Sequence, residues 1–113
     1  MSRWLDCCDA PNAKVLFRLH DTSHHDERVS LCACGQRWFI RFHEDVDWGG
    51  GGDDMQLWCT RISLAEATRL QAAHALGQRP DLSFLAHRPC VYVSPSGEIS
   101  TRQGAPTEPW PSR

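Results

Sequence analysis

The chain has 113 residues, of which 41% are hydrophobic, and a formal net charge of −2 at pH 7. This length supports one hydrophobic core but not two, and no apolar run approaches the roughly 18 residues that a transmembrane helix needs. The slightly acidic balance, without a cluster of basic residues, argues against a general nucleic-acid binder, because neutralising phosphates requires clustered cations. We therefore expect a single domain that contacts neither a membrane nor nucleic acid.

The N-terminal stretch MSRWLDCCDAP has neither the basic segment nor the apolar segment of a secretory signal. We therefore expect a cytoplasmic protein in a reducing compartment, where cysteines remain thiols. Trp4, Leu5 and the adjacent Cys7 and Cys8 precede a turn at residues 11–12. This segment predicts a short helix or an anchored arm.

The first strand is predicted over residues 14–20, where Val15, Phe17 and Leu19 fall on one face of an alternating pattern. The polar segment DTSHHDE then predicts a turn in which His24 and His25 are exposed.

The following hairpin carries two closely spaced thiols. Its second strand, over residues 29–34, places Cys32 and Cys34 on one face by alternation. Gly35 supplies the positive φ that a tight turn needs, and the aromatic-rich residues 37–43 form the third strand.

Residues 44–54 predict an acidic loop, because the glycines at 49–52 lose too much backbone entropy to lie inside a strand. Residues 55–62 predict a fourth strand. The helix that follows carries the clearest local signal in the chain. Ser63 and Glu66 form a capping box, an apolar stripe follows, and Gly77 ends a helix over residues 64–76.

Residues 80–89 predict a helical turn or loop, and residues 90–93 and 98–101 predict a β-hairpin. The Pro-rich tail over residues 103–113 should be extended and poorly ordered. We predict an α+β domain over residues 1–102, with an antiparallel sheet of about four to six strands and the helix over 64–76 packed on one face. The first three strands should form a meander.

Two thiols followed by a glycine suggest a zinc knuckle at Cys32 and Cys34, although the usual gap is two residues rather than one. A tetrahedral site needs two further ligands. The candidates are Cys7 or Cys8, Cys59, His20, His24, His25 and His43. The alternative is that both thiols are small buried side chains without a metal.

Five carboxylates flank the glycine run, and their spacing does not fit a calcium-binding loop. A solvated loop is the simplest interpretation. A tryptophan beside carboxylates is typical of a protein interface, so the second interpretation is a partner-binding surface. Its residues would be Glu44, Asp45, Asp47, Trp48, Asp53 and Asp54.

The segment LCACGQRWFIRFHEDVDWGGGGDDMQLW, followed by a capped helix, resembles small bacterial immunity proteins of polymorphic toxins. The likeness spans roughly residues 28–76 and rests on the CxCGQxW and EDVDW…GDD segments. It implies a non-catalytic inhibitor that binds a cationic toxin domain through the same acidic and aromatic residues.

No cysteine or histidine lies in a recognisable catalytic motif, so we expect no enzymatic activity and no small-molecule substrate. The alternative function is a small zinc-binding regulator or a metal-dependent enzyme that uses Cys32 and Cys34 as ligands.

Overall fold

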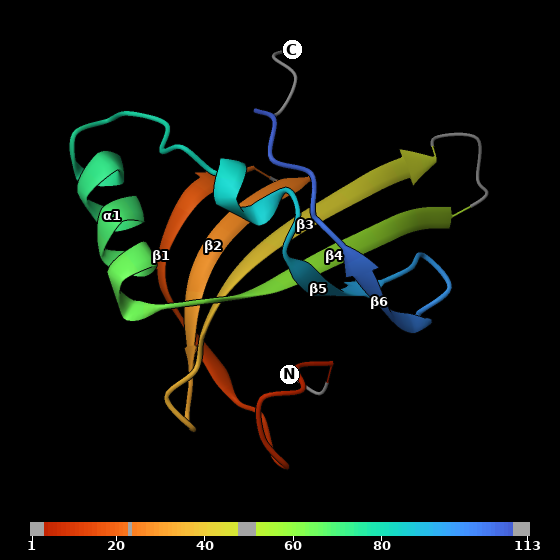
Figure 1. Cartoon of the computed structure of the whole chain (residues 1–113). Coiled ribbons are helices and arrows are strands. Elements are labelled where there is room, and N and C mark those ends of the chain that lie inside the picture. Colours follow the sequence, from red (N-terminus) through yellow and green to blue (C-terminus); the bar gives the residue numbers. More distant parts are fainter. Residues whose placement is uncertain (1–3, 23, 48–51, 110–113) are drawn as a thin grey trace.

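A computed structural model describes residues 4–22, 24–47 and 52–109 (Figure 1). It contains a six-stranded antiparallel sheet in the order β1-β2-β3-β4-β5-β6, one α-helix and one short 3₁₀ helix. Each strand pairs with its neighbour in sequence, so the meander predicted for the first three strands extends through the whole sheet. The α+β prediction is confirmed. The elements are β1 (Ala13–Asp21), β2 (His25–Cys32), β3 (Arg37–Asp47), β4 (Gly52–Ile62), α1 (Leu64–Ala75), η1 (Ser83–Leu85), β5 (Pro89–Val93) and β6 (Ile99–Gln103).

The alternation predicted for β1 is only partly correct. Register shifts between Val15 and Phe17 and between Arg18 and His20 interrupt its pairing with β2. Phe17 and Leu19 pack against the core, whereas Val15 is 40% exposed. A bulge adds one residue without a cross-strand partner, so side chains after it point to the opposite face of the sheet. A strict alternation of buried and exposed residues therefore does not hold along β1.

The turn predicted over DTSHHDE is too long, because β2 begins at His25 and pairs with β3 from His25↔His43 onward. The ring of His25 stacks on that of His43 at 5.0 Å between centroids, and both His24 and His25 are half-buried rather than exposed. The segment is polar because it contributes charged residues to buried ion pairs and not because it is exposed. Asp26 and Glu27 are among the buried charged residues of the sheet.

The acidic loop predicted over residues 44–54 is also too long. β3 runs to Asp47, β4 starts at Gly52, and their pairing continues to Asp47↔Gly52. Among the described residues, β2 pairs with β3 only as far as His43, and β5 pairs with β4 only over Leu57–Cys59. Residues 44–47 and 52–56 therefore form a two-stranded ribbon that projects past the neighbouring strands (Figure 1), which we call the acidic ribbon.

Both faces of the sheet are covered. On one face, the main core joins the sheet to α1 and η1. Its buried residues are Val29, Phe39, Ile62, Ala67, Leu70, Leu82 and Leu85. On the other face, the arm formed by residues 4–12 covers a second cluster that includes Leu5, Cys32, Trp38, Ile40, Cys59 and Val91.

Helix α1 begins as predicted. Ser63 Oγ accepts from the Glu66 amide at 3.1 Å, and Glu66 Oε1 accepts from the Ser63 amide at 2.8 Å. Gly77 follows the helix with φ +71°, a left-handed conformation that glycine adopts without strain. The predicted apolar stripe is too long, because Leu64 is 62% exposed and Leu76 is 73% exposed.

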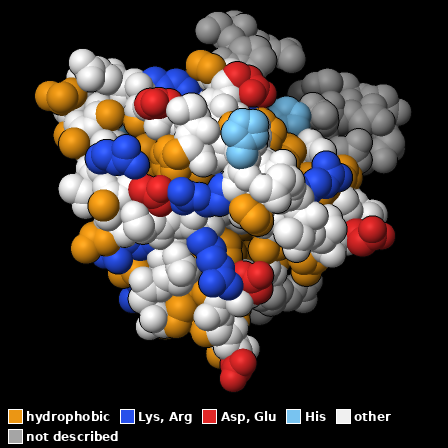
Figure 2. All heavy atoms as spheres, in the orientation of Figure 1, with side chains coloured by type: hydrophobic (Ala, Val, Ile, Leu, Met, Phe, Trp, Pro, Cys, Tyr) orange, Lys and Arg blue, Asp and Glu red, His pale blue; other side chains and the backbone are white. Residues whose placement is uncertain are grey.

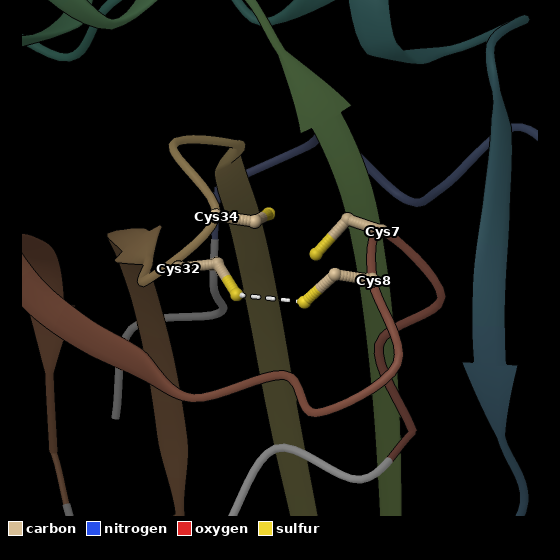
Figure 3. A group of neighbouring side chains, drawn as sticks. All are labelled: Cys7, Cys8, Cys32 and Cys34. Carbon is tan, nitrogen blue, oxygen red and sulfur yellow. Dashed lines mark hydrogen bonds between the residues drawn. The ribbon is translucent and has the colours of Figure 1, made fainter.

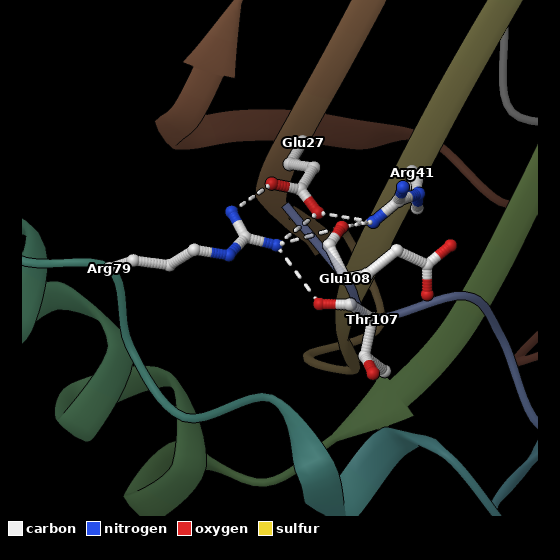
Figure 4. Close-up of polar contacts among 5 residues, drawn as sticks. All are labelled: Glu27, Arg41, Arg79, Thr107 and Glu108. Atoms are coloured by element: carbon white, nitrogen blue, oxygen red, sulfur yellow. Dashed lines mark hydrogen bonds and ion pairs between the residues drawn. The ribbon is translucent and has the colours of Figure 1, made fainter. Parts of the chain in front are cut away.

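A buried ion-pair network ties the C-terminal segment to the sheet (Figure 4). Glu27 of β2 is 0% exposed and accepts from Arg41 at 2.9 Å and from Arg79 at 2.8 and 3.1 Å. These guanidinium groups also donate to the carbonyl oxygens of Glu108 and Thr107. Residues 104–109 have no helix or strand, as predicted for the tail, but hydrogen bonds hold them against the domain.

Figure 2 shows basic and acidic side chains interspersed on the face that it presents. None of the described helices is both long enough and apolar enough to cross a lipid bilayer.

Candidate metal centre

Four cysteine thiols converge where the N-terminal arm meets the β2–β3 turn (Figure 3). The Sγ atoms of Cys7, Cys8, Cys32 and Cys34 all lie within 4.8 Å of one another. Cys8 Sγ and Cys32 Sγ are 3.8 Å apart. Within the described part of the chain, no other group of three or more Cys, His, Asp or Glu side chains meets the same criterion.

The β2–β3 turn explains how two residues so close in sequence aim their thiols at one point. Gly35 has φ +98°, and its amide donates to the Cys32 carbonyl at 2.9 Å. The Cys32 amide in turn donates to the Gln36 carbonyl at 2.9 Å. Cys32 thus ends β2 and Cys34 lies within the turn, so the prediction that both share a strand face is wrong, although their proximity is confirmed.

The arm that supplies the other two thiols has no strand or helix of its own, so side-chain contacts hold it. Leu5, which belongs to the arm, is only 3% exposed and packs into the second cluster. The Arg61 guanidinium donates to the Asp6 carbonyl and carboxylate at 3.0 Å. At the far end, the Ala33 amide donates to the Asn12 carbonyl at 3.0 Å. These contacts place Cys7 and Cys8 opposite the turn.

Two N–H groups point at the sulfur atoms. The Trp38 indole Nε1 donates to Cys7 Sγ at 3.4 Å, and the Asn12 amide donates to Cys32 Sγ at 3.4 Å. N–H donors favour a thiolate over a neutral thiol, because they stabilise the negative charge on sulfur.

The thiols differ in acidity for physical reasons. Hydrogen bonds from the backbone of Cys34 and Asn12 lower the pKa of Cys32 to about 6. Burial raises the pKa of Cys7 to about 12, and burial also raises the pKa of Cys8. A first thiolate is therefore favoured at Cys32, where backbone donors stabilise it.

The spacing of the thiols fits a tetrahedral zinc ion. With Zn–S bonds of about 2.3 Å, the edge of a regular sulfur tetrahedron is about 3.8 Å. The Cys8 to Cys32 distance has that value, and small side-chain rotations would bring the other pairs from within 4.8 Å to the same spacing. All four cysteines are free thiols, so none is occupied by a disulfide.

The structure brings two of the wider set of candidate ligands close to Cys32 and Cys34. Cys7 and Cys8 join Cys32 and Cys34, whereas Cys59 lies within the second cluster at 0% exposure. Burial raises the pKa of Cys59 to about 12, as expected for an inert thiol in an apolar environment. His20, His24, His25 and His43 do not belong to the thiol group.

The acidic residues predicted to bind a partner lie in the acidic ribbon rather than in a loop. Asp45 pairs with Asp54 across the ribbon, Asp53 pairs with Val46, and Asp47 pairs with Gly52. Trp48 lies outside the described residues.

Glu44, at the base of the ribbon, is engaged within the domain. Its carboxylate lies 3.3 Å from His24 Nδ1, and its side chain is only 19% exposed. Glu44 is therefore less available to a partner than its sequence position suggests.

Comparisons of the chain with protein-family models, with curated proteins and with solved structures found no match.

Proposed function

We propose that this chain is a zinc-binding protein in which a four-cysteine centre fastens the N-terminal arm to the β2–β3 turn. The convergence of four Sγ atoms within 4.8 Å carries this proposal. Four thiolates fill a tetrahedral coordination sphere, which leaves no position for a water molecule or a substrate. The centre is therefore structural rather than catalytic.

Elemental analysis of the purified protein tests the proposal directly. We expect one equivalent of zinc, lost when Cys8 is changed to serine. The matched control is Cys90→Ala, because Cys90 is buried at 4% exposure but does not belong to the thiol group. A protein without bound zinc after expression and purification in zinc-containing, reducing medium would contradict the proposal. So would a Cys8→Ser variant that retains a full equivalent.

A second candidate function concerns the acidic ribbon and rests on the resemblance of residues 28–76 to immunity proteins. The projection of residues 44–47 and 52–56 past the neighbouring strands favours this candidate, because a projecting hairpin can enter a cleft of a partner. Its backbone carries Asp45, Asp47, Asp53 and Asp54, and a cluster of like charge accelerates association with a cationic surface. We propose that the ribbon inhibits a cationic toxin domain and catalyses no reaction.

The test of this second candidate is the association rate with the product of the neighbouring reading frame, which the proposal expects to be a basic toxin domain. Changing Asp53 and Asp54 together to asparagine should slow association and weaken its dependence on salt. Asp6→Asn together with Asp9→Asn, on the arm rather than on the ribbon, forms a control of equal charge change. An equal response of the two double variants would show that net charge, rather than the ribbon, determines the rate.

A further inference from the structure

A groove with a volume of about 490 Å³ crosses the sheet face that also carries the N-terminal arm. This volume falls within the range of about 300–1,000 Å³ that is usual for small-molecule sites. Its apolar lining comes from four different parts of the chain, the arm and three strands. These residues are Trp4, Phe42, Met55, Leu57 and Val93.

One end of the groove holds a buried carboxylate with an unused acceptor. Asp26 is 7% exposed, and its Oδ2 accepts from the Arg28 guanidinium. Its Oδ1 lies 3.6 Å from Arg18 Nε, which is an ion pair beyond hydrogen-bond distance. Among the described residues, no group donates a hydrogen bond to Oδ1. A buried acceptor without a donor is uncommon in folded proteins and points to a partner from outside the chain.

The charges at this end balance. Arg18, Arg28, Asp21 and Asp26 all line the groove, and their formal charges sum to zero. A strongly anionic or cationic ligand would meet an equal number of like charges, so the rim favours a neutral molecule. Trp4 and Phe42, which also line the groove, favour an aromatic molecule, because aromatic rings pack well in offset or edge-to-face contacts.

We propose that this groove binds a small, neutral aromatic molecule that donates an N–H or O–H hydrogen bond to Asp26 Oδ1. The proposal goes beyond the zinc centre and the acidic ribbon. It depends on the placement of the arm, which carries Trp4, but not on the identity of the metal that fastens the arm.

Two probes of nearly equal shape test it on the full-length, metal-loaded protein. Indole has one N–H donor, and 1-methylindole has none. We expect indole to shift amide resonances of groove residues in a saturable way, with a Kd of about 1 mM, the weak affinity usual for a molecule of this size. 1-Methylindole should bind at least about tenfold more weakly, since it leaves Oδ1 without a donor. Indole-3-acetate and tryptamine, as charged counterparts, should also bind more weakly than indole.

A groove-filling variant locates the site. Met55 is 47% exposed on the groove wall, so Met55→Trp should fold normally and abolish the shifts. Leu76→Trp, at the exposed end of α1, is the matched control and should leave binding unchanged. Equal affinity for indole and 1-methylindole, tighter binding of either charged probe, the absence of saturable shifts, or unchanged binding in Met55→Trp would each overturn the proposal. A protein that binds indole in this way but contains no zinc would refute the metal proposal and leave this one standing.

Discussion

Removal of the proposed zinc ion should release the N-terminal arm and lower the stability of the whole domain. The centre links residues 24 positions apart, Cys8 and Cys32. By the chain-entropy relation used for covalent cross-links, closing a loop of this length stabilises the folded state by roughly 3–4 kcal/mol. Release of the arm also exposes Leu5, whose burial contributes about 1.5–3 kcal/mol.

Because the free arm keeps some of its contacts, we expect a net loss of about 3–5 kcal/mol on chelation. For a domain of this size, such a loss lowers Tm by roughly 10–20 °C. Calorimetry and circular dichroism with and without a strong chelator, in reducing buffer at neutral pH, measure this shift. Cys8→Ser should melt near the chelated wild type and show little further response to chelator.

The control is Cys90→Ala, which loses some packing in the core but should retain the full chelator response. A wild-type protein that releases its zinc and melts cooperatively at an unchanged temperature would refute the reasoning. In that case Leu5 and the hydrogen bonds of Asp6 and Asn12 would be enough to hold the arm, and the metal would contribute nothing to folding.

Three further perturbations test other parts of the structure. Glu27→Gln should destabilise the fold by about 3–5 kcal/mol in urea titrations, since it removes the carboxylate charge that lies against buried Arg41. Asp6→Asn, at an exposed pair, should cost less than about 1 kcal/mol. Burial and the neighbouring His43 lower the pKa of His25, so the unfolded state binds more protons and stability should fall as pH drops below about 6.5, a trend that His25→Gln should weaken. The Arg88 hydrogen bond lowers the pKa of Glu66 to about 2, so its contribution should be present above about pH 4.5 and be lost between there and about pH 2, with Glu66→Gln showing no such loss.

Local signals in the sequence predicted the parts of the fold that depend on neighbouring residues. The capping box at Ser63 and Glu66 and the terminating Gly77 determine α1 within a few residues, and all three are found as expected. Short connections between alternating segments predicted the meander. These features are visible in sequence because their energetics involve residues only a few positions apart.

The errors arise where partners are distant in sequence. Asp26 and Glu27 resemble turn residues, but Glu27 lies buried in β2 because Arg41 and Arg79 neutralise it from 14 and 52 positions away. The backbone entropy of its glycines predicts a loop for the glycine-rich segment, yet cross-strand pairing extends β4 back to Gly52. Periodicity reports burial of apolar side chains and does not detect ion pairs between strands.

In the candidate site, too, the contacts that are local in sequence could be predicted and the distant ones could not. The C-x-C-G spacing identifies Cys32 and Cys34, because one tight turn brings them together. The sequence does not distinguish Cys7 and Cys8 from the other candidate metal ligands, Cys59 and four histidines. Their position depends on how the arm packs, and that packing is set by Leu5 and by the Trp38 indole, which is 31 positions away from Cys7.

The proposed zinc ion would therefore have, on the arm side of the sheet, the role that α1 has on the other side: it would hold a covering segment against the strands. A helix satisfies its own backbone hydrogen bonds and needs only an apolar stripe to cover a sheet, whereas residues 4–12 include no helix or strand. A cross-link that closes near Cys8 compensates for this, since it restricts the arm whatever its conformation. Trp4 lies only three residues before Cys7 and forms one wall of the groove. Loss of the metal should consequently weaken indole binding as well as stability, and the two effects should share one dependence on zinc concentration.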